Sequence, residues 1–190
     1  SLMQNNNFNA VIDTTHPYAV IVSENIKKSA DITGIPYIRL LRPKQMINDL
    51  EKVKFVSSIE EAISYLSSTT ENILSTIGSK ELAKLCEISD YKERIFARIL
   101  PLPDMVKQCF DMGFTGKHLI CMQGPFSEEL NTALIHQFNI KYTLTKDSGK
   151  LGGFIEKVNS AKNTNTTLVV IGRPKVEQGF SYDEVIKMLL

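Results

Sequence analysis

Residues 73–82 read ILSTIGSKEL, in which a β-rich run with three apolar residues among its first five passes at Gly78 into a polar segment. A short β-rich run in which apolar and polar residues do not strictly alternate is consistent with a strand buried on both faces of a sheet. The segment therefore predicts a buried strand at Ile73–Ile77 that leads directly into a helix. Strands that alternate with helices in this way are typical of parallel sheets covered by helices.

The same alternation continues in both directions along the chain. We predict strands at Ala10–Ile12, Pro36–Leu40, Val53–Val56, Ile73–Ile77, Ile95–Arg98, His118–Met122, Tyr142–Thr145 and Leu168–Ile171. Helical stretches lie between them. The clearest one repeats apolar residues at positions i, i+3, i+4 and i+7, which share one helix face; these are Ile59, Ala62, Ile63 and Leu66. Ser57 and Glu60, three residues apart, predict a capping box at its start.

Three further apolar stripes predict helices later in the chain. They consist of Val106, Cys109 and Phe110, of Phe126, Leu130, Ala133 and Leu134, and of Val185, Ile186 and Leu189. From Ile73 onward the strand–helix units suffice for a complete doubly wound domain. The elements before Val53 are too few for a sheet domain. The sequence therefore predicts an α/β fold, with a remnant of a first domain at residues 1–50 and a second domain at residues 51–190.

The overall composition argues against several classes of protein. The 190 residues carry a formal net charge of +1, whereas nucleic-acid-binding and membrane-surface proteins rely on an excess of Lys and Arg. No apolar run approaches the ~20 residues that cross a bilayer, and no signal peptide is visible, so we predict a cytoplasmic protein without nucleic-acid or membrane partners. The cysteines lack CxxC spacing and no His, Asp and Glu residues have the spacing of metal ligands, so no metal site is predicted.

The segments that follow the predicted strands have an unusual composition. Ligands of open α/β sheets bind beyond the carboxyl ends of the strands. Six of these ends read DTTHPYA, STIGSKEL, ARILP, MQGPFSEELN, TKDSGKLGG and IGRP. They combine glycines with small polar and basic residues that can hold an anion. No nucleophile with its base is evident. The residues alone therefore predict a site for a polyanionic ligand, without covalent catalysis by the protein.

Each of these segments also has a purely structural interpretation. Thr15 or His16 can cap a helix rather than act on a ligand. The GSKEL segment lacks the GxxxxGK spacing of a phosphate-binding loop and can be a plain strand–helix turn, and the Lys and Asp of TKDSG can pair with each other. Arg98 and Arg173, at the ends of predicted buried strands, need a partner because an unpaired buried charge is costly. That partner can be a structural carboxylate or a ligand anion.

Taken as an ordered set, these segments resemble the precorrin-6A reductases of cobalamin biosynthesis, including the cobalt-precorrin-6A reductases of the anaerobic route. The resemblance is carried by VIDTTHPYA, GIPYIRLLRP, STIGSKEL, ARILP, QGPFSEELN, TKDSGKLGG, EKVNSA and IGRP. It extends from Ala10 to about Pro174. It implies two Rossmann-like parallel-sheet domains and an oxidoreductase that transfers a hydride from NADPH, or from NADH, to an oxidised corrinoid macrocycle. The nicotinamide carries the hydride, so the protein binds, orients and supplies a proton.

The resemblance also assigns roles to residues that match the family's motifs. Cofactor contacts are expected from Gly124, Pro125, Phe126, Ser127, Lys146, Asp147, Ser148 and Gly149. Substrate contacts are expected from Thr15, Tyr18, Arg39, Arg42, Gly78, Ser79, Lys80, Arg98 and Arg173. His16 is the expected proton donor, because imidazole titrates closest to neutral pH.

The sequence departs from the family pattern at its beginning. Family members start with a strand and a glycine-rich turn of the GGTxEA kind ahead of the THP motif, and this sequence has no such segment. We therefore expect a first domain truncated at its N-terminus, which self-associates through an unpaired sheet edge. Two alternatives stay open: a catalytically impaired corrinoid- or nucleotide-binding fragment, and an unrelated Rossmann-like enzyme such as a methyltransferase. The sequence does not distinguish NADPH from NADH or a cobalt-containing substrate from a metal-free one.

Overall fold

A computed structural model of the chain describes residues 3, 6, 8–41, 51–147, 152–172 and 178–190. All eight predicted strands form, each within about two residues of its expected ends. Within the described residues, the strands pair in parallel throughout. The predicted α/β fold is confirmed. The chain divides into two compact units, which we describe separately: unit 1 is Ser1–Lys44 with Arg173–Leu190, and unit 2 is Gln45–Gly172.

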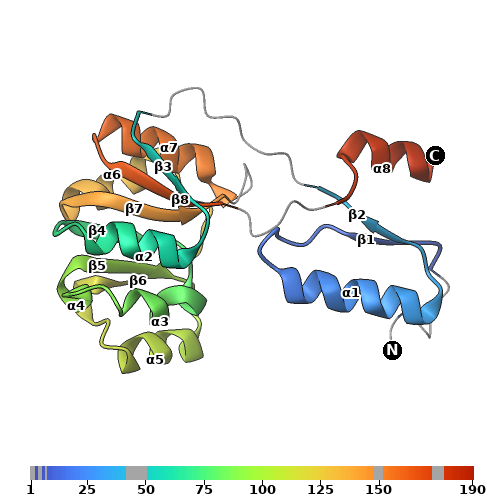
Figure 1. Cartoon of the computed structure of the whole chain (residues 1–190), viewed down its shortest axis with the longest axis horizontal. Helices are drawn as coiled ribbons and strands as arrows, with labels where there is room; N and C mark the ends of the chain where they lie inside the picture. The colour runs from blue at the N-terminus through green and yellow to red at the C-terminus, as the bar shows by residue number, and fades with distance from the viewer. Residues whose placement is uncertain (1–2, 4–5, 7, 42–50, 148–151, 173–177) are drawn as a thin grey trace. The chain divides into compact units, whose positions relative to one another are not determined.

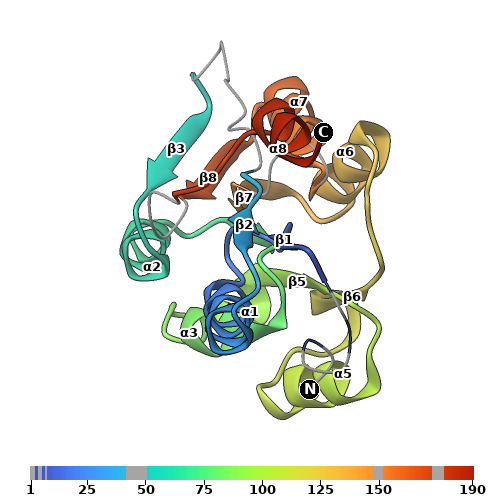
Figure 2. The same ribbon diagram turned by 90° about the vertical axis from the view of Figure 1, so that its right-hand side faces the viewer.

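Unit 2 is built on a six-stranded parallel sheet with the strand order β3-β8-β7-β4-β5-β6 (Figures 1 and 2). Its elements in chain order are β3 (Val53–Val56), α2 (Ile59–Ser67), β4 (Asn72–Ser75), η1 (Ser79–Glu81), α3 (Leu82–Leu85), α4 (Tyr91–Arg94), β5 (Ile95–Ile99), α5 (Pro103–Asp111), η2 (Gly116–His118), β6 (Leu119–Cys121), α6 (Glu128–Gln137), β7 (Ile140–Lys146), α7 (Phe154–Asn163) and β8 (Thr167–Ile171).

Helices cover both faces of this sheet (Figure 1). The helices α2, α3 and α5 pack over the larger core cluster, which includes Leu66, Leu85 and Cys109. The helices α6 and α7 lie side by side on the opposite face, where Ile135 and Phe154 are buried. Strand β5 is buried at every position, as expected for a strand between two helical layers.

Serine side chains define the starts of several helices. The hydroxyl of Ser58, which has extended backbone angles, accepts a hydrogen bond from the N–H of Glu61 at 3.2 Å and caps α2. The capping box predicted for Ser57 and Glu60 is therefore wrong by one residue. It is the Glu61 carboxylate, at 2.7 Å, that accepts a hydrogen bond from the backbone N–H of Ser57. Ser127 caps α6 in the same way as Ser58 caps α2.

The three later apolar stripes all differ from the faces that the helices bury. In the last of them, Val185 is buried, but Ile186 and Leu189 are exposed. On α5, Cys109 is fully buried, but Phe110 is 52% exposed. On α6, the buried residues are Asn131 and Ile135, and Phe126 precedes the helix instead of lying on it. The apolar stripe predicted for α6 could not identify its buried face, because Asn131, the most deeply buried residue of that face, is polar.

Unit 1 contains the parallel strands β1 (Val11–Asp13) and β2 (Tyr37–Arg39), connected by α1 (Val20–Thr33), and the helix α8 (Tyr182–Leu189). Phe180, just before α8, forms a β-bridge with Leu40. The N–H of Leu41 donates to the carbonyl of Phe180 at 2.8 Å. These contacts group residues 178–190 with unit 1, whereas the division predicted at residue 50 places them in the second domain. Backbone pairing of this kind leaves no periodic apolar signal, so the sequence does not reveal it.

Candidate functional site

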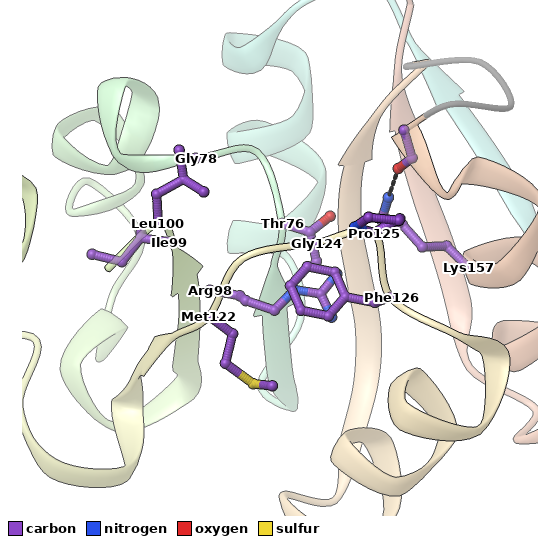
Figure 3. Close-up of a pocket in the computed structure, with 11 residues that line it drawn as sticks. Thr76, Gly78, Arg98, Ile99, Leu100, Met122, Gly124, Pro125, Phe126 and Lys157 are labelled. Carbon is purple, nitrogen blue, oxygen red and sulfur yellow. Dashed lines mark hydrogen bonds between the residues drawn. The ribbon is translucent and has the colours of Figure 1, made fainter. Parts of the chain in front are cut away.

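A cavity of about 340 Å³ lies in unit 2 at the carboxyl ends of β4, β5 and β6 (Figure 3). Its walls include Gly78 after β4, Arg98 in β5, the segment 124–126 after β6, and Lys157 of α7. This is the edge at which parallel α/β sheets bind their ligands. Gly78 is suited to this loop because its φ of +85° lies in a region that other residues rarely adopt.

Arg98 forms the floor of the cavity. Its side chain is 5% exposed, and its Nη1 donates to Oδ1 of Asn131 at 2.8 Å. The guanidinium carbon lies 3.8 Å from the centroid of the Phe126 ring, a cation–π contact that is visible in Figure 3. No ion pair joins Arg98 to an Asp or Glu of the described residues. Burial lowers the pKa of Arg98 to about 10.

Lys157 is the second buried cation of the cavity. It is 7% exposed and shares the buried face of α7 with Phe154. Its Nζ donates to the carbonyl oxygens of Gly152 at 2.7 Å and Gly153 at 3.3 Å. Within the described ranges no carboxylate forms an ion pair with it. The pKa of Lys157 is lowered to about 8, mainly by burial and also by the charge of Arg98, whereas Glu156 acts in the opposite direction.

These two cations make the cavity suited to an anion. Removing a cation from water costs free energy unless an anion or several hydrogen bonds compensate it. Arg98 and Lys157 have neutral hydrogen-bond acceptors, and the charge of Arg98 lowers the pKa of Lys157. A phosphate or carboxylate bound in the cavity would stabilise both charged forms.

Several residues predicted from the sequence come together in this cavity. Gly78 and Arg98, expected to contact the substrate, line it together with Gly124, Pro125 and Phe126, expected to contact the cofactor. Ser127 follows directly as the cap of α6. The predicted cofactor and substrate residues are therefore not separated into two sites within unit 2.

Other predicted residues of unit 2 lie outside the lining of this cavity. Ser79 and Lys80 begin the short helix η1, and the side chain of Lys80 is exposed. The ammonium of Lys146, at the end of β7, lies 3.5 Å from the Glu81 carboxylate. Asp147 follows β7, and its N–H donates to the carbonyl of Ile171 at 3.1 Å. The remaining predicted site residues lie outside the described residues; they are Arg42, Ser148, Gly149 and Arg173.

The predicted residues of unit 1 form a separate polar cluster at the ends of β1 and β2. The guanidinium of Arg39 is paired with the Asp13 carboxylate at 2.9 Å, and it also donates to the Thr15 hydroxyl at 3.0 Å. Nδ1 of His16 accepts a hydrogen bond from the N–H of Tyr18 at 3.3 Å. Neither Thr15 nor His16 caps α1, which begins after Ala19 without a side-chain cap. A role of Arg39, Thr15 and Tyr18 in substrate binding stays a prediction.

The lowered pKa of the buried Asp13 carboxyl predicts acid sensitivity of unit 1. Burial would raise the pKa of Asp13, but hydrogen bonds from the Thr15 N–H and the Tyr37 hydroxyl lower it from 3.8 to about 2. The pKa of Asp13 is lower in the folded chain than in the unfolded chain, so its ionised carboxylate stabilises the fold above about pH 4. This stabilisation is lost as the pH falls from about 4 to about 2. A shift of this size corresponds to roughly 2 kcal/mol. Urea unfolding followed by the NMR signals of β1 and β2 measures it.

The control for this prediction is a pair of Asp→Asn variants. Asp13→Asn leaves a buried arginine without its carboxylate and is expected to destabilise unit 1 by about 3 kcal/mol at pH 7 while removing the loss below pH 4. Asp31→Asn, at an exposed position of α1, is expected to change neither quantity. An equal acid sensitivity of Asp13→Asn and the unmodified chain would contradict the assignment.

The site residues predicted from the sequence include neither Lys157, which lines the cavity together with Thr76, Ile99, Leu100, Met122 and Gly152, nor Asn131, which contacts Arg98. Lys157 lies three residues after Phe154 on the buried face of α7, and Asn131 lies four residues before Ile135 on the buried face of α6. Both interrupt an apolar face with a polar side chain, which is the signal that could have identified them.

In the described part of the chain, no group of three or more His, Cys, Asp and Glu side chains could hold a metal ion. Among the described helices, none is both long and apolar enough to cross a membrane.

The fold and the cavity define a Rossmann-like α/β protein with a cationic ligand site. The chain belongs to the family described as Precorrin-6x reductase CbiJ/CobK, which it matches over residues 1–190. A cobalt-precorrin-6A reductase of Priestia megaterium is 37% identical over 188 residues, covering 95% of this chain and 72% of that protein. A cobalt-precorrin-6A reductase of Salmonella typhimurium is 33% identical over 165 residues, covering 86% of this chain and 62% of that protein.

A solved structure has the same fold. It is described as CobK precorrin-6A reductase and aligns with a TM-score of 0.76 at 19% identity, covering 95% of this chain and 72% of that one. The chain thus spans 72% of the length of the first relative and 62% of the second. Members of the family are oxidoreductases, and membership implies a nicotinamide cofactor.

Proposed function

We propose that the protein carries out the reduction of precorrin-6A, or of its cobalt form, to the 6B state in corrin ring synthesis. The observation that carries this proposal is the match of the whole chain to the precorrin-6x reductase family. Membership in this family argues against the alternative of an unrelated methyltransferase. The overall reaction adds a hydride and a proton across one double bond of the macrocycle, and the nicotinamide supplies the hydride when it is bound.

The cavity of unit 2 supports this proposal because it fits part of either ligand. Both the dinucleotide and the corrinoid present anionic groups, pyrophosphate in one and carboxylates in the other. A volume of about 340 Å³ accommodates such a group rather than a whole ligand. We assign to Arg98 and Lys157 the task of binding this anionic group, and to the segment 124–126 the task of enclosing it. Their contribution to the reaction is binding and orientation.

The finer parts of the proposal concern the cofactor and the cell compartment. We propose NADPH as the reductant, with NADH as the alternative, in accordance with the family resemblance. A cytoplasmic location is part of the same proposal, because the dinucleotide pool that such an enzyme uses is found there.

An anaerobic assay tests the function directly. The chain is incubated with precorrin-6A or cobalt-precorrin-6A and with NADPH or NADH, and the product is followed by mass spectrometry as a gain of two hydrogens. We expect turnover with at least one substrate and a preference for NADPH. Absence of product in every combination, with dinucleotide binding retained, would favour the alternative of a catalytically impaired binding fragment.

His16 is our proposed proton donor in this reaction. Removal of a general acid typically reduces turnover by 10²–10⁴-fold, so His16→Ala is expected to lower kcat by about 100-fold with little change in KM. His136→Ala, at an exposed position near the end of α6, is the matched control and is expected to retain full activity. Unchanged turnover of His16→Ala would remove this residue from the mechanism.

We further propose that the protein self-associates through unit 1. Apolar side chains of α1 support this, since Ile21 is 74% and Ile32 is 78% exposed in the chain by itself. Light scattering over a range of concentrations measures the oligomeric state. A monomer at the highest concentration would rule self-association out.

A further inference from the structure

Asn131 occupies an unusual place beside Arg98. It is 2% exposed, and its Oδ1 accepts the 2.8 Å hydrogen bond from Arg98 that fixes the guanidinium at the floor of the cavity. Its Nδ2 donates to the carbonyl oxygen of Ser127 at 2.8 Å. Both ends of the amide are therefore engaged, and each meets a partner of the opposite hydrogen-bonding character. The residue joins β5 to the beginning of α6.

The chemistry of this contact differs from that of an ordinary buried arginine. A buried guanidinium is usually paired with a carboxylate, which neutralises it. Asparagine has nearly the shape of aspartate and gives Arg98 the same acceptor oxygen, but it carries no charge. Elsewhere in the chain, Arg39 has such a carboxylate partner in Asp13. The amide thus orients Arg98 and leaves its charge available in the cavity, next to that of Lys157.

We propose that Asn131 is a positioning residue that keeps the cavity cationic and thereby selects a ligand group with two negative charges. This inference rests on the proposed function, because the pyrophosphate of the dinucleotide and a pair of corrinoid carboxylates both have that charge. Asn131 itself acts through Arg98 and contacts no ligand.

Two substitutions separate a role in charge from a role in structure. Asn131→Asp retains a hydrogen-bond acceptor for Arg98, but its carboxylate neutralises the charge of the guanidinium. The affinity for inorganic pyrophosphate is therefore expected to fall by about 30-fold or more. Asn131→Ala keeps the charge of the cavity but loses the orientation of Arg98, and a smaller loss of about threefold to fivefold is expected. The matched control Asn165→Asp adds the same charge at an exposed turn before β8 and is expected to bind within twofold of the unmodified chain.

The thermal stability of the variants provides a second readout. Asn131→Ala leaves Arg98 and the carbonyl of Ser127 without their buried partner, so it is expected to have the lower unfolding temperature of the two. Asn131→Asp also loses the donor to Ser127, because a carboxylate only accepts, but it keeps a charge-assisted contact to Arg98 and is therefore expected to be the more stable. The order of stability is then opposite to the order of pyrophosphate affinity, which a purely structural role of Asn131 would not produce.

Calorimetric titration of the whole chain with inorganic pyrophosphate measures the affinities. Displacement of pyrophosphate by NADP⁺ would assign the site to the dinucleotide, and displacement by uroporphyrin, a polycarboxylate tetrapyrrole, would assign it to the corrinoid; either supports the inference. Equal or tighter binding by Asn131→Asp than by Asn131→Ala would overturn it, as would the absence of pyrophosphate binding by the unmodified chain. Turnover of precorrin-6A by that chain tests the proposed function independently of these results.

Discussion

Replacement of Arg98 by methionine is expected to lower the affinity of the unit 2 cavity for inorganic pyrophosphate by about 100-fold, the effect of removing a buried, oriented guanidinium from an anion site. The side chain is buried and fixed by Asn131 and Phe126, so its charge reaches the ligand with little screening by water. Methionine fills a similar volume but leaves the buried Oδ1 of Asn131 without its donor, so the variant is also expected to be less stable by about 1–3 kcal/mol. Calorimetric titration and the unfolding temperature measure the two effects separately.

The Arg98→Met variant is also expected to change the pH dependence of pyrophosphate binding. The charge of Arg98 contributes to the lowered pKa of Lys157, about 8, so its removal is expected to raise that pKa. Residual pyrophosphate binding should then persist to higher pH than in the unmodified chain, where it weakens as Lys157 loses its proton above about pH 8. The control for a change in net charge is Lys141→Met. It removes an exposed cation near the start of β7, at the end of the strand away from its carboxyl end. A loss of affinity as large in this control as in Arg98→Met would refute the site.

Replacement of Phe114 by alanine is expected to destabilise unit 2 by about 3–5 kcal/mol. Phe114 is fully buried beneath α5, and its ring lies 5.6 Å from that of Tyr91. Its backbone is held by a 3.0 Å hydrogen bond to the carbonyl of Cys109, so the surrounding structure can close the resulting cavity only in part. Hydrogen exchange of the amides of β5 measures the loss of stability in this unit.

Phe110→Ala is the matched control for that experiment. Phe110 lies four residues earlier and is 52% exposed on α5, so the same substitution is expected to cost only about 0.5 kcal/mol. Similar losses in the two variants would contradict the assigned burial of Phe114 and exposure of Phe110. Both substitutions remove the same atoms, so the difference between them reports mainly burial, with a small contribution from the higher helix propensity of alanine at position 110.

The strands were the most predictable part of the fold. Each is a short β-rich run, and the runs of β5 and β8 are almost continuously apolar because helices cover both of their faces. The rule that ligands bind at the carboxyl ends of parallel strands selected the segments that contain Gly78, Arg98 and residues 124–126, and these residues line one cavity.

The parts that could not be predicted involve polar residues in buried places. Lys157 and Asn131 lie on helix faces that periodicity assigns to apolar residues, and their partners are distant in the sequence. Arg39 was expected to bind a ligand carboxylate, but nothing in the sequence identifies Asp13, 26 residues away, as the group that accepts its hydrogen bonds. Such pairings depend on the tertiary fold rather than on local pattern.

The β-bridge between Leu40 and Phe180 makes unit 1 discontinuous in sequence, with unit 2 inserted between its two segments. About 140 residues separate the bridged positions, and an unfolded loop of that length opposes their meeting by its entropy. Once β3 and β8 have paired as neighbours, the effective length of this loop becomes much shorter, which favours closure by on the order of 1–2 kcal/mol. Folding of the inserted unit should therefore precede and assist docking of the C-terminal segment, so a substitution that unfolds unit 2 is expected to loosen α8 as well.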